Sequence, residues 1–593
     1  MNYSDLSPPQ GTHLPGPQDG LRAFIPPGCP LLTLLVVGGV ALVIRAAFFA
    51  ELLHKLPFYG STYPGFDQHL YDQWAQAIAA GDWLSTSQRL FYGSPLYPYL
   101  LACAYCIAGT SNVLAGIVMN GIFGVCAAVL AAALGGKLFG RWGALAAGLL
   151  MALNGSQVSW EAVLVVDSLL PAFCLGALLL IVTYLERGCV WGEGHPTLKP
   201  LPLWVWLFPG LLLGLATLGL GIAALAAAGL CILIGAVSLR RPVWRAAAAA
   251  GLMALAICLV VAVPILRNGL MYGRWTATLN GPVTFYIGNA PGATGVFGEP
   301  PGFAETRERL EKSTHPASAW LQQLRADLKA HPGALRAALL RKTCLLFNSW
   351  DAPDNSNYYF ARHYTLSLRY LTFGPLFLYV VGFLGIALTF RRWRALLPLY
   401  VFGALFGLGL VLVFMSGRYK LPFLALLTVF GGGAAAILVE HLRACRFRLP
   451  LASVLFAGLL TAAFWPRGPV GLGGEWTVFR PPEYLNNAAV LMKEGREAEA
   501  LALLEDGHAL FPRKPEFIER LAYLYLKTGR PQDAAAVTER AVARGVVSRR
   551  ILERRVLAYE ALSQWDKAHA AATDLRARYP ESELGKEPVM TPQ

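Results

Sequence analysis

Several long apolar runs constrain what this chain can fold into more than any other feature. The runs 31–53, 244–266 and 370–390 approach or reach the roughly 20 residues that a helix needs to cross a bilayer. Of the 593 residues, 55% are hydrophobic and only 15% are charged, whereas a soluble protein of this size would carry more charge. The sequence therefore predicts an all-α protein built on a polytopic bundle of transmembrane helices, and it excludes an ordinary soluble fold.

Hydropathy and loop charge together predict the topology. About eleven spans are expected, at approximately 31–53, 112–135, 142–155, 168–185, 202–218, 220–237, 244–266, 368–390, 395–415, 419–440 and 449–465. The apolar run 95–108 is shorter, so we expect it to lie in the membrane interface. The basic clusters 391–394 and 443–448 then fall on one side, which the positive-inside rule assigns to the cytoplasm. The loops 54–111 and 267–367 and the C-terminal region face outward, which in a bacterial inner membrane means the periplasm.

The remaining composition argues against nucleic-acid binding and against a metal centre. The net charge is +14, and in a membrane protein an excess of Lys and Arg reflects topology first. The ten cysteines are scattered, mostly within apolar runs, as expected for small buried hydrophobic side chains. The histidines lack the spacing of zinc ligands, so no metal site is predicted. Residues 1–30 are rich in Pro and Gly and are expected to form a disordered tail before the membrane domain, 31–466.

The composition changes beyond the last span, where residues 481–583 are charged, rich in Ala and periodic. Gly495, Gly529 and Ser563 are spaced by 34 residues, and an Ala follows five residues after each of them. A small residue at a helix turn and Ala at a helix–helix contact, repeated at this period, are typical of tetratricopeptide repeats. We therefore predict a C-terminal α-solenoid that binds a protein partner. The alternative is an irregular helical tail whose Ala spacing arose by chance.

The first outward loop, 54–111, carries acidic side chains among aromatic ones. Carboxylates are costly to hold at a membrane domain, and Tyr and Trp favour the membrane–water interface. We therefore expect a polar reaction at the lipid surface, with its acid or base on this loop. Asp67 and Asp72 are candidates, and Tyr97 is a candidate for substrate contact. The structural alternatives are that Asp67 caps the helix that follows it and that Asp72 lies inside that helix.

Further candidates flank later spans. Glu161 and Asp167 lie in the second outward loop and could supply another carboxylate, although Asp167 could instead cap the next span. Arg418 and Lys420 stand at the outer ends of spans, against the topology bias, and basic residues there suit a lipid phosphate. The alternative for both is ordinary snorkelling. Arg267, just after a span on the same side, is a further candidate.

Five segments resemble a known family when they are taken in order. The segment FDQHLYDQWAQAIAAGDW (66–83), followed by SPLYPYLLACAY (94–105), resembles the first outward loop of the GT-C glycosyltransferases. The branch is similar to the protein O-mannosyltransferase-like family 39, which also holds the lipid A aminoarabinose transferases. PILRNGLMY (264–272), RKTCLLFNSWDAPDN (341–355) and FMSGRYKLP (414–422) resemble further segments of that family. A C-terminal tetratricopeptide array is common in one bacterial subgroup.

The resemblance implies a GT-C fold and transfer of a sugar from a polyprenyl-phosphate carrier to a periplasmic protein, lipid or glycan. Asp67 occupies the position of the family's first-loop Asp, which implies that it is the base that takes the acceptor's proton. Asp167 stands at a place similar to the family's second acidic residue. The leaving phosphate needs cationic side chains. No cofactor is assigned by this resemblance, and a divalent cation stays open.

Two other functions remain open on the sequence. The chain could be a non-catalytic membrane scaffold that docks partners through its repeats, or a transporter of lipid-linked sugars. The sequence lacks two similar halves with paired broken helices, which argues against the transporter. The partners expected for the transferase are the polyprenyl-phosphate sugar, a periplasmic acceptor, membrane lipids and a protein bound by the repeats, with no nucleic acid.

Overall fold

The computed structural model describes residues 30–62, 64, 66–88, 90–187, 202–237, 243–311, 316–466 and 479–582. These residues form helices joined by loops, with two isolated β-bridges, which confirms the all-α prediction. The predicted tail, residues 1–30, lies outside the described residues apart from Pro30. The chain divides into two compact units. We call them the membrane unit and the repeat unit and describe each by itself.

The membrane unit takes in the chain up to Phe48, then Gly65–Ser356 and Tyr370–Pro469. Within the described residues, it holds six helical stretches that are long and apolar enough to cross a bilayer. They are α1 (Leu31–Lys55), α4 (Val113–Ala152), the 3-10 turn η3 (Val166–Leu169) with α6 (Leu170–Arg187), α9 (Val243–Tyr272), α16 (Pro375–Thr389) with α17 (Trp393–Leu412), and the turn η7 (Arg418–Lys420) with α18 (Leu421–Arg443). Shorter apolar helices complete the set, namely α3 (Leu96–Ala108), α7 (Leu207–Gly219), α8 (Ala223–Val237) and α19 (Arg448–Ala463). Each of the predicted spans falls on one of these helices, so the chain is a multi-pass membrane protein.

The helix α4 contains two of the predicted spans, and a glycine divides them. Gly140 has φ 74° and ψ −168°, a conformation that only glycine adopts readily, and it interrupts the helix. The halves on either side pack closely, because a Cβ at Gly135 would come 2.6 Å from the carbonyl oxygen of Gly143. Small residues allow such close approach of helices where the hydrophobic effect does not drive association.

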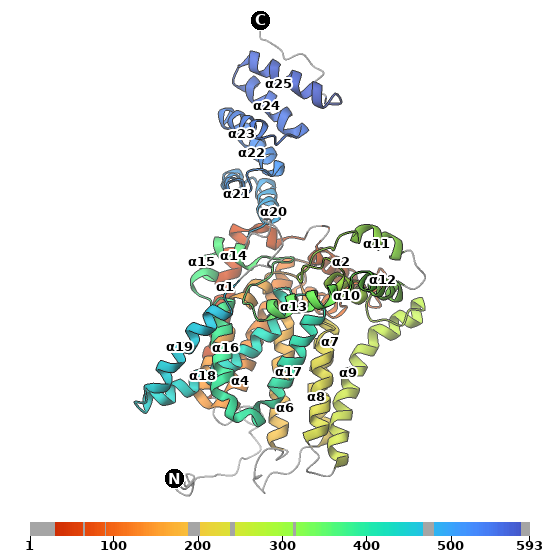
Figure 1. The fold of residues 1–593 in the computed structure, drawn as a ribbon, viewed down its shortest axis with the longest axis vertical. Helices are drawn as coiled ribbons and strands as arrows, with labels where there is room; N and C mark the ends of the chain where they lie inside the picture. Colours follow the sequence, from red (N-terminus) through yellow and green to blue (C-terminus); the bar gives the residue numbers. More distant parts are fainter. Residues whose placement is uncertain are drawn as a thin grey trace. The chain divides into compact units, whose positions relative to one another are not determined.

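Helices in the loops of the membrane unit gather at one end of the long helices. Figure 1 shows α6, α7, α8, α9 and α17 running side by side, with α2 and α10–α13 beyond one end. The loop helices are α2 (Asp67–Ala79), α5 (Gly155–Glu161), α10 (Asn280–Asn289), α11 (Phe303–Glu311), α12 (Pro316–Ala330) and α13 (Ala334–Leu346). A small apolar core joins α10, α11 and α12, in which the ring of Tyr286 lies 4.9 Å from Trp320 and 6.3 Å from Phe303.

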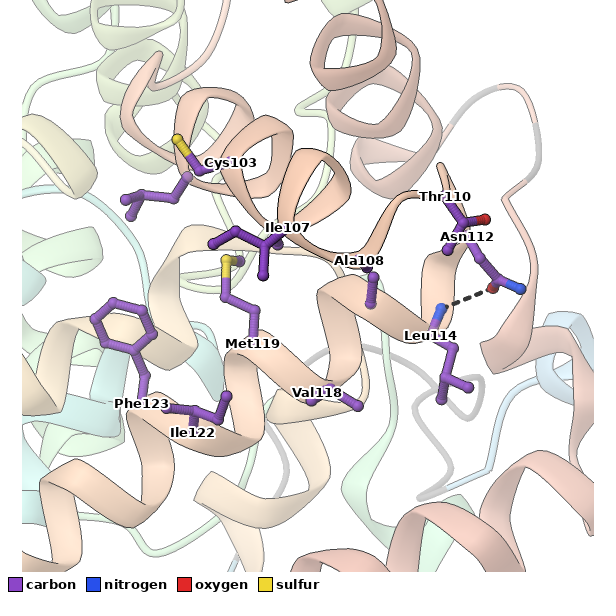
Figure 2. A pocket seen from close by; sticks show the side chains of 13 residues that line it. Cys103, Ile107, Ala108, Thr110, Asn112, Leu114, Val118, Met119, Ile122 and Phe123 are labelled. Carbon is purple, nitrogen blue, oxygen red and sulfur yellow. Dashed lines mark hydrogen bonds between the residues drawn. The ribbon is translucent and has the colours of Figure 1, made fainter. Parts of the chain in front are cut away.

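An apolar pocket of about 520 Å³ lies between α3 and α4. Figure 2 shows Ile107 of α3 facing Met119 and Phe123 of α4 across this pocket. A second apolar pocket, of about 360 Å³, borders α3 on Leu96 and also contacts Arg267 of α9. Both pockets have the apolar lining that suits hydrocarbon.

The repeat unit is built from helical pairs. Its main helices are α20 (Pro481–Lys493), α21 (Glu497–Leu510), α22 (Pro515–Lys527), α23 (Pro531–Ala543), α24 (Arg549–Ala561) and α25 (Trp565–Arg578). Gly495, Gly529 and Ser563 all have positive φ at the turns between paired helices, where a small residue costs least. The three alanines of the repeat, at positions 500, 534 and 568, are fully buried. The predicted register therefore matches the observed helical turns and contacts.

Two short segments from earlier in the chain belong to the repeat unit, namely Phe49–Pro64 and Asn357–Arg369. The latter contains α14 (Tyr358–Tyr364) and most of α15 (Leu366–Tyr370). The Phe58 amide donates to Asn487 Oδ1 at 3.2 Å, and the ring of Phe360 lies 5.0 Å from that of Tyr484. The first repeat helix is therefore packed on residues from both outward loops.

Lys342 of α13 is fully buried, and its ammonium donates to carbonyl-type oxygens of α10 and of the residue that follows α17. The bonds run to Gly288 O at 3.0 Å, Asn289 Oδ1 at 2.8 Å and Val413 O at 3.0 Å. Burial lowers the pKa of Lys342 to about 8, from an ordinary value of 10.5. Between pH 8 and pH 10.5, Lys342 is therefore protonated in the unfolded chain and deprotonated in the folded protein. The free energy of unfolding should therefore rise with pH, by about 1.4 kcal/mol per unit for this one group.

Lys342→Met should remove this pH dependence. We expect the melting temperature of the wild-type protein in detergent, minus that of Lys342→Met, to increase from pH 8 to pH 10.5. Other titrating groups are common to both proteins and cancel in the difference. A difference that stays flat across this range would contradict the prediction.

Candidate functional site

The guanidinium of Arg418 is the centre of a cluster of three carboxylates. Its Nη1 lies 2.9 Å from Asp67 Oδ2 and 3.6 Å from Asp167 Oδ2, and its Nε lies 2.9 Å from Asp354 Oδ2. Arg418 belongs to the 3-10 turn η7 and is only 9% exposed. The cluster therefore joins α2, η3, the segment after α13 and the start of α18. Such burial excludes the snorkelling alternative for Arg418.

Asp67 is the most accessible carboxylate of the cluster, with a side chain that is 38% exposed. It is the first residue of α2, and the cap position is held by Phe66, so the alternative in which the Asp67 side chain caps the helix does not hold. Its position in the first turn still suits the positive end of the helix dipole. Asn355 Nδ2 donates to Asp67 Oδ2 at 2.7 Å, which is the same oxygen that Arg418 binds. Both of these bonds leave Asp67 Oδ1 without a hydrogen bond among the described residues.

Asp167 is 2% exposed and lies in η3, at the start of the α6 stretch. Its Oδ2 faces Arg418. Its Oδ1 has no hydrogen-bond partner among the described residues, although it is buried. An unsatisfied buried carboxylate oxygen is costly, so this atom is available for a group that the chain itself does not supply.

Asp354 and Asn355 complete the cluster, and neither residue was a candidate on the sequence. They follow Pro353 in the loop between α13 and α14, where the Asp354 amide donates to Ser356 O at 3.0 Å. Ser416 Oγ donates to Asp354 Oδ2 at 3.3 Å. The only signal in the sequence was that these residues belong to the segment 341–355, which had been matched to the family as a whole.

Lys420 lies close in sequence to Arg418 but has different contacts. Its Nζ donates to the carbonyl oxygens of Leu345, Asn348 and Trp350, at 2.7, 2.9 and 3.3 Å. These bonds occupy all three ammonium protons. Lys420 therefore holds the chain after α13 against η7, and it has no N–H left to offer a phosphate in this conformation.

Asp351 is a buried carboxyl beside this lysine. It accepts hydrogen bonds from Ser156 Oγ and, at 3.4 Å, from Trp160 Nε1. Burial raises the pKa of Asp351 from its ordinary value. Gly417 is required at this point, because a Cβ there would lie 1.7 Å from Asp351 Oδ1. The contact places the residue before Arg418 directly on the DAPDN segment.

The other predicted site residues have partners elsewhere in the membrane unit. Asp72 accepts from Tyr105 OH at 2.6 Å, and Tyr97 OH donates to Asn120 Oδ1 at 3.1 Å. Glu161 is fully buried against Arg45 of α1. The structure thus brings together Asp67, Asp167 and Arg418 out of the predicted set, and these remaining residues support the surrounding helices.

Arg267 fastens the first outward loop to the end of α9. Its guanidinium donates to the carbonyl oxygens of Leu84, Ser85 and Gln88, at 3.1, 2.6 and 2.7 Å. It also lies 4.3 Å from the centre of the Phe91 ring. The positive charge of Arg267 therefore faces backbone oxygens and an aromatic ring, and it is not part of the Arg418 cluster.

Within the part of the chain that the structure describes, no group of three or more His, Cys, Asp or Glu side chains could hold a metal ion by itself. The three carboxylates point at a guanidinium instead. The free oxygens, Asp67 Oδ1 and Asp167 Oδ1, would give a bound cation two protein ligands at most. Two carboxylates suit Mg²⁺, which keeps several waters and binds substrate phosphates, better than they suit a closed zinc site.

Several solved structures are similar to this chain at a low level. An archaeal oligosaccharyltransferase AglB from Archaeoglobus fulgidus, in complex with an inhibitory peptide and a dolichol-phosphate, matches at 15% identity with a TM-score of 0.40. The match covers 74% of this chain and 56% of that one. The apo form from the same organism matches at 16% identity with a TM-score of 0.38, covering 73% and 54%. The chain thus spans just over half the length of these structures.

The sequence comparisons concern the C-terminal region. No curated protein matches the chain. Residues 491–552 match the family model for the tetratricopeptide repeat. This match confirms the type of repeat that the 34-residue period predicted, and the C-terminal helices are therefore tetratricopeptide repeats.

Proposed function

We propose that this chain is a GT-C membrane glycosyltransferase, related to the protein O-mannosyltransferase-like family, that moves a sugar from a polyprenyl-phosphate carrier to an acceptor on the outer face of the membrane. The observation that carries the proposal is the Arg418 cluster. It joins the first-loop Asp, a second buried Asp and a basic residue of the SGRYK segment, which lie far apart in the sequence. Three loose sequence resemblances would not converge on one guanidinium unless they served one site.

Asp67 is the base in this mechanism. Its Oδ2 is held by Asn355 and Arg418, so its orientation is set, while Oδ1 remains open and the side chain is partly exposed. As the acceptor oxygen or nitrogen attacks the anomeric carbon, its proton passes to Asp67 Oδ1. The bond from that carbon to the phosphate oxygen breaks, and its electron pair leaves with the polyprenyl phosphate. A single displacement of this kind inverts the configuration at the anomeric carbon.

Arg418 has two roles in this proposal. Its Nε and Nη1 orient the three carboxylates. The two N–H groups of its Nη2 are the ones that would donate to the leaving phosphate. A guanidinium that is already fixed by carboxylates needs no reorganisation when charge develops on the phosphate.

One positive charge faces three carboxylates in this cluster, and an anionic donor would add more negative charge. A divalent cation held by Asp167 Oδ1, with Asp67 Oδ1 left free to take the acceptor's proton, would offset that charge and bind the donor phosphate. The buried, unpaired Asp167 Oδ1 fits this role.

The carrier's hydrocarbon also has a place to bind in this proposal. Two apolar pockets border α3, which lies near the end of the first outward loop. Their linings are mostly apolar, with leucine and phenylalanine side chains in both, and suit an isoprenoid chain. A donor whose chain lies against α3 would bring its phosphate to the outer end of the membrane unit.

The proposal is tested with Asp67→Asn and a matched control, Asp72→Asn, on the same helix. Membrane vesicles with the outer face exposed supply the acceptors, and a panel of radiolabelled polyprenyl-phosphate sugars supplies the donor. Transfer of label to protein, glycan or lipid should fall by about 10²–10⁴-fold in Asp67→Asn, because the base is lost. Asp72→Asn keeps its hydrogen bond to Tyr105 through the side-chain oxygen, so its transfer should stay within about threefold of wild type.

Equal transfer by Asp67→Asn and the wild-type protein would overturn the proposal. So would movement of the labelled carrier across the bilayer without any transfer of sugar, which would identify a transporter. Both proteins must be inserted in equal amounts, which an immunoblot against the repeat unit measures.

A second function, docking of a partner protein, is supported by the tetratricopeptide match at residues 491–552. Such arrays bind partners on a concave surface. We propose that docking accompanies transfer and brings an acceptor or an envelope protein to the enzyme.

A further inference from the structure

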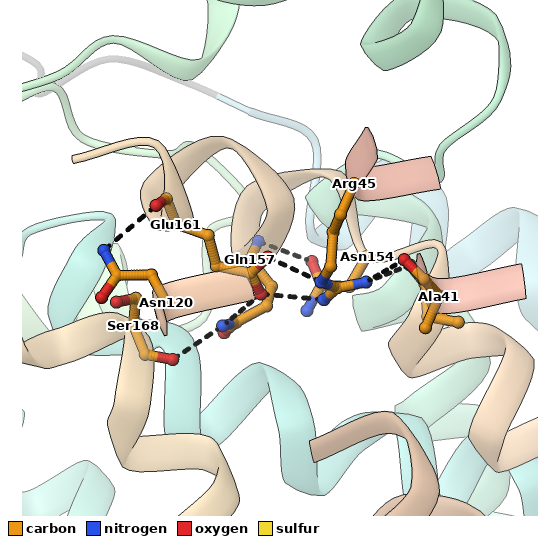
Figure 3. Close-up of polar contacts among 8 residues, drawn as sticks. Ala41, Arg45, Asn120, Asn154, Gln157, Glu161 and Ser168 are labelled. Carbon is orange, nitrogen blue, oxygen red and sulfur yellow. Dashed lines mark hydrogen bonds and ion pairs between the residues drawn. The ribbon is translucent and has the colours of Figure 1, made fainter. Parts of the chain in front are cut away.

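The short helix α5 is entirely buried, although its sequence, GSQVSWE, is mostly polar. Burying polar side chains is costly unless they are hydrogen-bonded. Figure 3 shows that Gln157 and Glu161 of α5 face Arg45 on one side and Ser168 on the other. The helix therefore carries a polar network into the interior of the membrane unit.

The network begins with a buried ion pair. Arg45 Nη2 donates to Glu161 Oε1 at 2.8 Å, and Arg45 Nε lies 2.7 Å from Glu161 Oε2. Arg45 and Glu161 are 2% and 0% exposed. Arg45 also donates to Ala41 O at 3.1 Å and to Ala152 O at 3.3 Å, so the pair joins α1, α4 and α5.

Gln157 links this ion pair to the turn that carries Asp167. Its Nε2 donates to Glu161 Oε1 at 2.8 Å and to Ser168 O, also at 2.8 Å. These two bonds use both protons of the amide. Ser168 is the next residue after Asp167, so the bond holds the backbone carbonyl one residue beyond the carboxylate that faces Arg418.

Two more side chains hold the same turn. Asn120 Nδ2 donates to Val163 O at 2.9 Å, and Ser168 Oγ donates to Val165 O at 3.1 Å. Together with Gln157, they bind three carbonyl groups of the residues 163–168. A turn of irregular backbone inside a protein needs its polar groups paired, and here the pairing also decides where Asp167 lies.

Stability alone does not account for this network. A buried ion pair of this kind is often no more stable than apolar side chains of similar volume. Several of its polar atoms also lack hydrogen bonds among the described residues, including Asn154 Nδ2, Gln157 Oε1 and Ser159 Oγ. A polar network with unpaired atoms costs stability, which points to a role in the site that it supports.

We propose that Gln157 is a positioning residue for the transfer reaction: held by the Arg45–Glu161 pair, it fixes the 163–168 turn so that the Asp167 carboxylate stays against Arg418. The inference rests on the proposed function. Gln157 touches neither the substrate nor Arg418 in this proposal and acts through Asp167. Misplacing a reacting group by about 1 Å can lower the rate about 100-fold. A loosened turn should therefore lower kcat more than it changes KM for the donor.

The test is a double-mutant cycle between Gln157→Met and Asp167→Asn in the full chain, with the vesicle assay described above. Methionine has nearly the shape of glutamine but makes neither bond. We expect Gln157→Met to lower kcat by about 10–100-fold, with less than about a threefold change in KM for the labelled donor. In the Asp167→Asn background, Gln157→Met should lower kcat no further. Thr389→Val, which removes a buried hydrogen bond to Gly385 O at the far end of α16, is the control and should transfer at the wild-type rate.

If the kcat of the double variant falls by the product of the two single-variant losses, the inference is overturned. Such a result means that the two substitutions act independently, because independent effects add in free energy. Full transfer by Asp167→Asn, with Asp67→Asn inactive, would also overturn it while leaving the glycosyltransferase in place. If the wild-type chain transfers nothing, the proposed function fails, and amide hydrogen exchange decides the positioning claim alone. Exchange of residues 163–168 should be at least tenfold faster in Gln157→Met and unchanged in Thr389→Val, and equal exchange in both would overturn it.

Discussion

Replacing Arg418 by methionine is expected to lower sugar transfer by about 10²–10³-fold or more, because the leaving phosphate loses the cation that would stabilise it. The same change leaves Asp67, Asp167 and Asp354 facing one another without a counter-ion. Like charges at this distance repel, and at least one carboxyl should take up a proton. The vesicle assay with labelled donor measures the loss, and thermal unfolding in detergent measures the accompanying fall in stability.

Two further variants separate charge from geometry at position 418. Arg418→Lys keeps the charge but offers a single ammonium instead of a planar guanidinium. Compared with Arg418→Met, it should therefore restore more of the stability than of the transfer rate. Adding Asp354→Asn to Arg418→Met removes one of the stranded carboxylates and should restore part of the stability without restoring transfer. Arg418→Met with wild-type transfer would show that this cation has no part in the reaction.

The second large effect concerns the buried ion pair of α1 and α5. Arg45→Met should lower the free energy of unfolding by about 3–5 kcal/mol, because it leaves the Glu161 carboxylate buried without its counter-ion, and the neutral amide of Gln157 does not replace that charge. Both side chains are almost completely inaccessible, so water cannot replace the lost contact. Thermal or denaturant unfolding of the full chain in detergent gives the difference from wild type.

Removing both charges should be much less damaging than removing one. The double variant Arg45→Met with Glu161→Met replaces the pair by apolar side chains, and we expect it to be closer to wild type in stability than either single variant. Its transfer rate should still fall, since Gln157 loses the carboxylate that holds it. Equal stability of the single and double variants would contradict this account of the pair.

The sequence alone determined the features that depend on neighbouring residues. Long apolar runs require helices in a bilayer, because no water is available to pair exposed backbone groups, and the predicted spans coincide with helices. The repeat register followed from Gly495, Gly529 and Ser563, since a positive φ at a helix turn favours small residues. The sequence also predicted Asp67, Asp167 and Arg418 as separate candidates. Each is a charged side chain at a membrane domain, where holding a charge costs free energy.

Only the tertiary structure decided which of these residues meet. Arg418 and Asp67 are 351 positions apart, and no periodicity or local propensity says which distant charges will share a hydrogen bond. The partnership of Asp354 and Asn355 with this cluster, the capture of Lys420 by three carbonyl groups and the pairing of Glu161 with Arg45 all arise from the way the helices pack. Local sequence determines where helices form and what charge they carry, whereas the position of a side chain in a buried site depends on contacts between segments that are distant in the chain.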